Sequence, residues 1–370
     1  MYQLYYDVWG KRIKKRFERT LYKASQKSTL SAKESGKVML WQIKKVLHCH
    51  FPDLSTRLSC LCDPRKGIQY TIEELVMASL VLFLLKCDSR NDFNLKRDIL
   101  FIQNYYRMFR LRLPGMDAVN ELFEKMDTKE LEDIRCVFIS ALISKRIFHK
   151  IRFFGKYFYI AIDGTGTYNW GDTPPEEIIP FALKKESRKG AVNYTGQVLE
   201  AVLICSNGMY IPLVTEWIAN DSQKYDKQDC ELKAFKRLAV RLKEYFPRLN
   251  ICVLADGLYS NVSIMDVCHN NAWSLFNNQK NRGGPLHHKF NRKIFDALKN
   301  WHSIRQLASM MLQLVIHARE LQQLKAKSEI KITWKELWKN LNAFLTMCLA
   351  EELIDEFEVW SKVRRQVRLE

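Results

Sequence analysis

A change of hydrophobic period at Lys156 constrains the fold of this chain more than any other feature. From Thr71 to about Phe148, apolar residues recur every three to four positions, which is the spacing of amphipathic helices. After Lys156 the apolar runs are short, rich in aromatic and β-branched residues, and separated by turn residues. We therefore expect a helical module followed by an α/β region.

The order of the segments after Lys156 defines the α/β expectation. The run "KYFYIAID" predicts a strand, and "NYTGQVLEAVLICSNGMYIPLVTEWI" predicts two strands joined by a turn at Ser206, Asn207 and Gly208. The next segments predict a helix, "KQDCELKAFKRLAVRLKEYF", a strand, "NICVLAD", and a serine-capped short helix that returns to a strand, "SNVSIMDVCHNNAW". Strand, hairpin, helix, strand and helix in this order are typical of an α/β layer architecture.

Three regions follow from these patterns. We expect a helical N-terminal region over 1–150, an α/β core over 151–295, and a helical C-terminal region over 296–370. The first 50 residues hold 12 Lys and Arg against 3 Asp and Glu, a net charge of +9. This excess favours a DNA-contacting arm, and a solvated helical face is the alternative.

The charge of the whole chain also indicates a polyanionic partner. With 59 Lys and Arg against 41 Asp and Glu, the net charge is +18, which points first to nucleic acid and second to an anionic membrane surface. The strongest apolar run, Leu75 to Leu85, spans 11 residues, whereas crossing a bilayer takes about 20, so we predict a buried helix there. The N-terminal segment lacks the pattern of a secretory signal, and we expect a cytoplasmic protein with reduced cysteines and no membrane partner.

Two segments carry the candidate chemistry. "YFYIAIDGTGT" and "NICVLADGLYS" each end an apolar strand with Asp followed by Gly, which places Asp163 and Asp256 at strand ends. The ends of strands are where α/β sheets position functional groups, although Asp-Gly is also a common turn. Two such aspartates in a strongly basic chain suit phosphoryl transfer on a nucleic-acid backbone. That reaction uses two Mg²⁺ or Mn²⁺ ions about 3.5–4 Å apart, held by carboxylates, substrate phosphate and water.

Several segments together resemble the DDE transposases of bacterial insertion sequences. These segments span most of residues 60 to 315 and are, in chain order, "DPRKGIQYTIEELVMASLVLFLLKCDSRNDFN", "LPGMDAVNELF", "AIDGTGT", "LKKESRKG", "TEWI", "KQDCELKAFKRLA", "FPRLNICVLADGLYSN" and "FNNQKNRGGPLHHKF". The resemblance implies an RNase H-like mixed-sheet core flanked by helical regions, with the first catalytic aspartate at Asp163 and the second at Asp256. It also implies Mg²⁺ or Mn²⁺ as cofactor and DNA, both transposon ends and target, as partner of a homo-oligomer.

The third acid of the family has no counterpart at its expected place. Its glutamate lies in a segment resembling W-x-I-E-N-E-G-F-N-x-Q-K, and only "FNNQK", Phe276 to Lys280, matches the end of that segment. The preceding "NAWSL" matches an earlier strand of the family, so we interpret the junction of Leu275 and Phe276 as an internal deletion. Val267 to Phe295 contains no acidic residue. Glu320, on a predicted helix after the junction, is a candidate substitute. Glu216 and Glu231 are not obvious replacements, because they match positions that exist beside the glutamate in intact relatives.

The basic tract after the junction is the expected DNA contact. In "NRGGPLHHKF" and just before it, Lys280, Arg282 and Lys289 would face phosphates, and an ordinary solvated loop is the alternative. Three functions remain open from the sequence: a transposase that cuts and joins DNA, a catalytically defective derivative that binds DNA only, and an unrelated RNase H-like nuclease.

Overall fold

The computed structural model describes residues 32–170, 183–186, 192–218, 231–256, 259–277, 295–318, 321–322 and 333–347. The described residues form two compact units. One runs up to Leu122 and resumes at Met311, and the other runs from Phe123 to Met310. The two units are described separately below.

The first unit is helical, as the period of its sequence predicts. Its helices are α3 (Ala32–His50), α4 (Leu54–Ser59), α5 (Ile72–Leu84), α6 (Arg90–Leu95), α7 (Ile99–Phe109), most of α8 (Met116–Phe123), the end of α12 (Phe295–Ile316) and α14 (Trp334–Met347). Helices α3 and α14 pack closely because residue 36 is glycine: a Cβ there would lie 2.4 Å from Cβ of Phe344.

Helix α5 is the buried core helix expected from the apolar run. Thr71 and Glu74 form a capping box at its start, which satisfies two backbone N–H groups that the helix leaves open. Eleven of its 13 residues are buried. Within the described ranges, no helix combines the length and apolarity that a membrane span requires.

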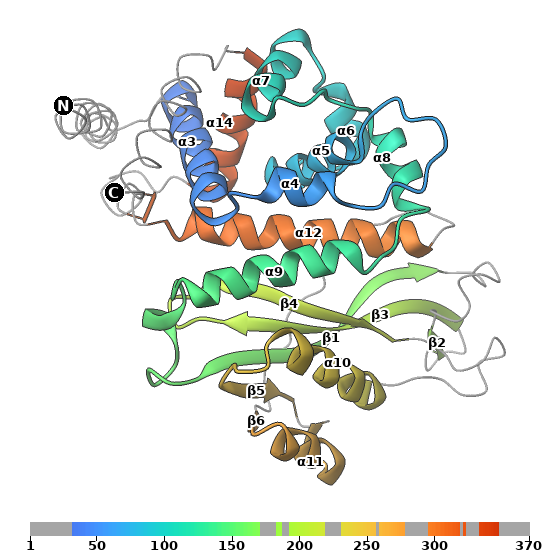
Figure 1. The fold of residues 1–370 in the computed structure, drawn as a ribbon, viewed down its shortest axis with the longest axis vertical. Helices are drawn as coiled ribbons and strands as arrows, with labels where there is room; N and C mark the ends of the chain where they lie inside the picture. The colour runs from blue at the N-terminus through green and yellow to red at the C-terminus, as the bar shows by residue number, and fades with distance from the viewer. Residues whose placement is uncertain are drawn as a thin grey trace. The chain divides into compact units, whose positions relative to one another are not determined.

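The second unit is built on a six-stranded mixed sheet (Figure 1). Strand β3 pairs with β1 on one edge and with β2 and β4 on the other, all antiparallel, and β1, β5 and β6 follow one another in parallel. The strands are β1 (Phe158–Trp170), β2 (Leu183–Glu186), β3 (Val192–Ile204), β4 (Tyr210–Trp217), β5 (Ile251–Ala255) and β6 (Ser274–Asn277). The mixed α/β class expected from the sequence is confirmed.

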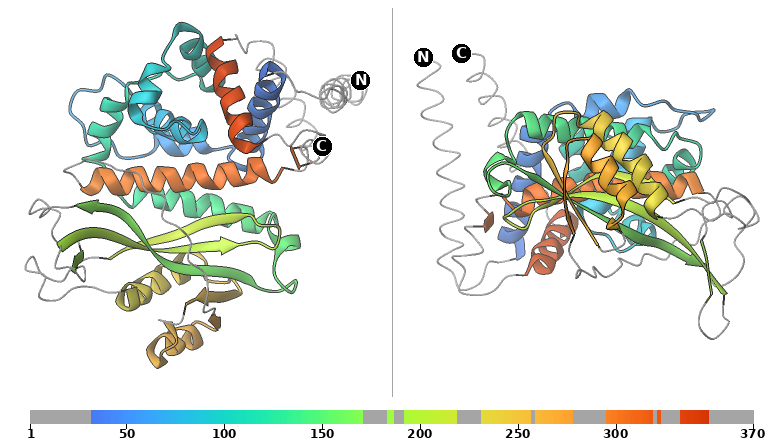
Figure 2. Two further views of the ribbon diagram at one scale, coloured as in Figure 1. Left: turned by 180° about the vertical axis from the view of Figure 1, so that it is seen from behind. Right: turned by 90° about the horizontal axis from the view of Figure 1, so that it is seen from below.

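Helices cover both faces of this sheet. Helix α10 (Glu231–Tyr245) connects β4 to β5, and α11 (Val262–Asn270) connects β5 to β6. Helix α9 (Glu130–Ser144) packs beside β4 on the side away from α10, and the first part of α12 lies with α9 (Figure 1). A short 3-10 helix, η2 (His149–Ile151), leads from α9 toward β1. Figure 2 shows the strands crossing with the twist that β-sheets ordinarily have.

The core of the second unit lies between these layers. Because both faces are covered, consecutive residues of a strand are buried, as from Ile211 to Thr215 in β4. The buried strand residues include Ile160, Ile162, Leu199, Ala201, Leu203, Ile211 and Leu213. The hairpin predicted between β3 and β4 turns at the expected residues, with Gly208 at a φ of +83° that favours glycine.

The boundaries between the two units differ from the boundaries at 151 and 295 that the sequence pattern predicts. Helix α9 belongs to the sheet-containing unit, and α12 contributes residues to both units. Periodicity alone cannot assign a helix to one unit or another, because an apolar stripe does not reveal which neighbour it packs against. The functional roles assigned to the three regions stay predictions.

Candidate functional site

Asp163 and Asp256 occupy corresponding positions on neighbouring parallel strands. Ala161 of β1 pairs with Leu254 of β5, and each aspartate comes two residues later. Continued by two residues, this register puts both aspartates side by side on one face, on strands about 4.8 Å apart. The sequence placed both aspartates at strand ends. Asp256 directly follows β5, as predicted, but the prediction is wrong for Asp163, because β1 continues to Trp170 through its pairing with β3. The pairing of β1 with β5 is what brings the two aspartates together.

The surroundings of Asp163 disfavour its negative charge. Partial burial is the largest cause of a raised pKa for Asp163, and the charges of Asp256 and Glu200 raise it further, while the N–H of Gly164 lowers it. Glu200 lies directly opposite Asp163 in the β1–β3 register. The site therefore concentrates negative charge, which is the condition under which a bound cation gains most.

A further carboxylate reaches the same end of the sheet from helix α10. A Cβ on Gly164 would lie 2.3 Å from Oε1 of Glu231, so the absence of a side chain at 164 makes room for this carboxylate. The hydroxyl of fully buried Tyr259 donates to Oε2 of Glu231 at 3.0 Å. Burial strongly raises the pKa of Tyr259, and the charges of Glu231, Asp256 and Asp163 add to this effect.

Glu200 is held by helix α12. Its Oε1 lies 2.9 Å from Nε2 of His302 and 3.0 Å from Nε2 of Gln306. Burial raises the pKa of Glu200, but His302, Arg305 and Gln306 together outweigh it and lower that pKa to about 2. Burial lowers the pKa of His302 despite the nearby carboxylate. Since Arg305 can only donate to Nδ1 of His302, at 3.3 Å, the neutral ring carries its proton on Nε2, the ring nitrogen nearer to Glu200.

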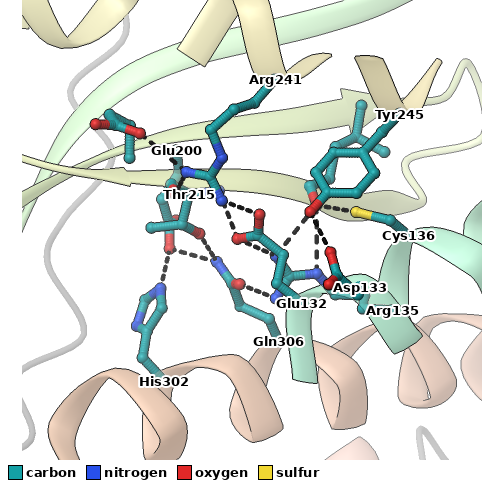
Figure 3. A network of polar contacts seen from close by, with 12 residues as sticks. Glu132, Asp133, Arg135, Cys136, Glu200, Thr215, Arg241, Tyr245, His302 and Gln306 are labelled. Carbon is teal, nitrogen blue, oxygen red and sulfur yellow. Dashed lines mark hydrogen bonds and ion pairs between the residues drawn. The ribbon is translucent and has the colours of Figure 1, made fainter. Parts of the chain in front are cut away.

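A buried polar network continues from this pair to the free edge of β4 (Figure 3). Gln306 donates to Oγ1 of Thr215 at 2.6 Å and accepts from Arg135, whose side chain is fully buried. Arg135 also donates to the carbonyl of Leu213, at 3.1 Å from Nη2, and Arg241 donates to the carbonyl of Thr215 at 2.7 Å. Side chains thus occupy backbone groups that an edge strand would otherwise leave open to another chain.

Glu132 completes this network. It pairs with Arg135 at 3.4 Å and with Arg241, and it lies 3.5 Å from the backbone N of Thr215. Arg241 pairs in addition with Glu216 at 2.9 Å. The network joins helices from both faces of the sheet to β4, so it fixes the layers that position β3 and Glu200.

The proposed deletion junction lies inside a regular strand. Leu275 and Phe276 belong to β6, and the parallel pairing with β5 continues across them to Asn277. Trp273, just before this strand, is buried, whereas Phe276 is 58% exposed. The strand therefore pairs without interruption at the junction.

The remaining predicted residues fall outside this arrangement or outside the described ranges. Lys280, Arg282 and Lys289 lie outside the described residues, as does Glu320. Helix α12 is described throughout and contains one acid, Asp296, in its first turn. In the described part of the chain, no group of three or more His, Cys, Asp and Glu is arranged to hold a metal ion, and no disulfide joins the described cysteines.

Sequence reasoning missed the residues that surround the aspartates. Glu200 comes from β3, the first strand of the hairpin, and His302 and Tyr259 approach from other elements. Glu231, at the start of α10, matches a family position in the sequence but was not predicted to lie beside Gly164. One signal was visible: Glu200 is the one charge in the apolar run "GQVLEAVLI", and such a charge needs a partner when the strand is buried. Nothing in the local pattern identifies that partner as His302.

Comparisons with protein-family models, with curated proteins and with solved structures found no match to this chain.

Proposed function

We propose that this chain is a transposase-like protein of the DDE type, which binds DNA and cuts and joins it by metal-dependent phosphoryl transfer. The observation that carries the proposal is the register of β1 and β5, which aligns Asp163, within β1, with Asp256, directly after β5. Two carboxylates side by side are the minimum that the chemistry needs, because substrate phosphate and water complete the coordination of each ion.

The sheet topology supports an RNase H-like core for this function. The three antiparallel strands β4, β3 and β1 are followed across the sheet by β5 and β6, both parallel to β1. Helices α10 and α11 provide the crossover connections between β4 and β5 and between β5 and β6. Of the two proposed catalytic aspartates, Asp163 then lies in β1, and Asp256 directly follows the neighbouring strand β5.

The donor atoms suit Mg²⁺ or Mn²⁺. Both ions prefer carboxylate oxygen. The pKa of Asp163 is raised first by its burial and then by the charges of Asp256 and Glu200, and a bound cation would offset both effects. Bound at this site, the metal would lower the pKa of an attacking water or hydroxyl and stabilise the leaving oxygen. Asp163 and Asp256 would hold it, and Glu231, fixed by Tyr259, lies close enough to add to the negative field.

The other parts of the chain have supporting roles in this proposal. The charge of +18 would attract DNA, and Lys280, Arg282 and Lys289 would contact its phosphates, as the resemblance implies. The protein would act in the cytoplasm as a homo-oligomer on paired transposon ends.

A second candidate function is a derivative that binds DNA without cutting it. The observation that favours it is the content of helix α12, where Asp296 is the one acid, together with the acid-free run from Val267 to Phe295. Losing one positioned group of an active site commonly costs about 3–4 kcal/mol in the transition state.

Cleavage of the DNA that flanks the coding sequence separates these candidates. We expect the wild-type protein to nick an end-labelled flanking fragment with Mn²⁺, and Asp163→Asn to bind the same fragment without nicking it. Asp266→Asn, on the exposed side of α11, is the matched control and should cleave as the wild type does. Binding by the wild type without any nicking would establish the second candidate, and equal nicking by Asp163→Asn would refute the proposed site.

A further inference from the structure

A tight turn before β1 presents a phenylalanine in an unfavourable conformation. Phe153 and Tyr157 pair across the turn, and the backbone N of Lys156 donates to the carbonyl of Phe153 at 3.2 Å. Between them, Phe154 has φ +51° and Gly155 has φ +65°. Two consecutive positive φ angles are typical of hairpin turns that favour Asn or Asp followed by Gly, and a bulky residue at the first position costs about 1–2 kcal/mol.

The side chain of Phe154 gains no burial in return. It is 86% exposed, while the adjacent rings of Phe153 and Tyr159 stack on each other at 4.2 Å with an interplanar angle of 10°. The ring of Phe154 lies 6.4 Å from that of Tyr159. Neither turn propensity nor packing explains a phenylalanine here, so its exposed ring is the feature that needs a function.

The surroundings of this ring are basic and contain no acid along the chain. From Ile134 to Ile162 there is no Asp or Glu, and exposed Lys150 and Lys156 flank the turn. Arg152 packs over the ring of Phe158, with Cζ 5.6 Å from its centre. Lys156 lies over the ring of Tyr157, with Nζ 5.0 Å from its centre, so two cations of this segment contact aromatic rings.

The neighbouring segments preserve this charge. The backbone N of Ser206 donates to the carbonyl of Ile151, and the side chain of Asn250 donates to the carbonyl of Lys156. Residues 205–209 and 246–250, to which these donors belong, contain no acid, and the second adds exposed Arg248. Phe154 with Lys150, Arg152, Lys156 and Arg248 is called the basic aromatic turn below.

We propose that the basic aromatic turn binds single-stranded or locally unstacked DNA, with a base stacked on Phe154 and the backbone phosphates against its cations. Aromatic rings interleaved with cations are the usual means of holding unpaired nucleotides, because every base offers a flat face and every nucleotide a phosphate. An anionic membrane surface would also attract the cations. Only one strongly exposed apolar side chain of the turn, that of Phe154, would insert into it, however.

The position of the turn separates it from the proposed catalytic site. It precedes β1 at the end of the strand where the chain arrives from α9 (Figure 1), whereas Asp163 lies five residues into the strand. At about 3.3 Å per residue, the start of β1 is roughly 16 Å from Asp163, which corresponds to about five nucleotide steps. This inference deepens the proposed function and rests on it for the identity of the nucleic acid, since it adds a contact for DNA at a distance from the reacting phosphate.

The test measures binding in the Asp163→Asn background, so that cleavage plays no part. The probe is a fluorescein-labelled single strand of about 20 nucleotides, longer than the site of one binding domain, compared with its duplex. Phe154→Asn should weaken single-strand binding at least about fivefold, which is the lower range for losing one stacked base. Its thermal midpoint should stay the same or rise, because Asn suits the turn better than Phe.

Two further variants control this result. Leu95→Asn removes an equally exposed apolar side chain, also 86% exposed, from helix α6 and should leave binding unchanged. Lys150→Gln with Lys156→Gln should reduce the slope of log affinity against log salt by about 1.4, as expected when two phosphate contacts to a single strand are lost. Lys66→Gln with Lys129→Gln, also exposed, has the same net charge and should reduce that slope less.

The outcomes distinguish this inference from the proposed function. Wild-type affinity in Phe154→Asn would overturn the inference even if the wild-type protein cleaves DNA. Weakened binding in Phe154→Asn, with no cleavage by the wild type, would support the inference and count against the proposed function. Loss of binding to anionic phosphatidylserine vesicles in Phe154→Asn, without any change for DNA, would assign the turn to a membrane and overturn the inference.

Discussion

Gly164 shows how one missing side chain can shape a site. Its neighbour Asp163 faces one side of the sheet, and the space that a Cβ on Gly164 would take is filled by the carboxylate of Glu231. That carboxylate is in turn held by the hydroxyl of Tyr259. The glycine therefore allows a helix to bring a carboxylate against the strand that carries the first aspartate.

Gly164→Ala should destabilise the protein by about 1–2 kcal/mol, because the added methyl group displaces Glu231 and breaks its hydrogen bond with Tyr259. Gly166→Ala is the matched control in the same strand, since a Cβ there meets nothing within 4 Å. Urea unfolding gives both values. In a Glu231→Ala background the cost of Gly164→Ala should nearly vanish, and an unchanged cost would show that the contact with Glu231 is not its cause.

His302 makes stability depend on pH. The folded protein holds the pKa of His302 below its ordinary value of 6.5, so the unfolded chain takes up the proton first and acidification through pH 6.5 favours unfolding. Glu200 adds to the loss of folding stability only at lower pH, because its pKa is about 2 in the folded protein, below its ordinary value of 4.5. The contribution of Glu200 is therefore present above pH 4.5 and disappears as the pH falls toward 2.

His302→Gln should remove the first of these two effects. Glutamine can still donate to Glu200 but has no proton to bind, so the decrease in unfolding free energy between about pH 7.5 and about pH 5.5 should be smaller in the variant. Guanidinium unfolding at both pH values measures this difference. An identical decrease in the two proteins would mean that the pKa of His302 is not lowered in the folded state.

At the scale of elements, Arg135 connects helix α9 to the edge of β4. Its guanidinium is fully buried and contacts Leu213, Gln306 and Glu132. Removing one partner of a buried charged network leaves the others without compensation, which typically costs 3–5 kcal/mol. Arg135→Met should therefore destabilise the protein by about this amount.

The control for this prediction is Arg237→Met on helix α10. Arg237 pairs with Glu216 at 2.6 Å, but its side chain is 44% exposed, so its loss should cost no more than about 1 kcal/mol. Thermal unfolding of the two variants compares them directly. If both variants lose equal stability, the buried network does not hold the layers together as described.

Much of the order of elements was predictable, while the contacts between them were not. The turn at Gly208 and the strand that ends just before Asp256 follow from local composition, because turn residues and short apolar runs act over a few positions. The end predicted at Asp163 is wrong, because pairing with β3 extends β1 to Trp170. The pairing of Glu200 with His302 and the insertion of Glu231 beside Gly164 depend on how distant helices pack. A single sequence contains no local signal for such contacts.

At the scale of the whole molecule, charge and sheet geometry lead to the same proposal. A net charge of +18 favours a polyanion, and the parallel pairing of β1 with β5 places two carboxylates where a cation and a phosphate could meet. The central claim is that Asp163 and Asp256 together bind a divalent cation.

Titration with Mn²⁺ followed by electron paramagnetic resonance tests this claim most directly, because it detects the ion without requiring any DNA or activity. We predict that the wild-type protein binds Mn²⁺ and that Asp163→Asn and Asp256→Asn each weaken this binding at least about tenfold, as expected when a ligand is replaced. Asp266→Asn should bind as the wild type does. Unchanged Mn²⁺ affinity in both Asp163→Asn and Asp256→Asn would contradict the account.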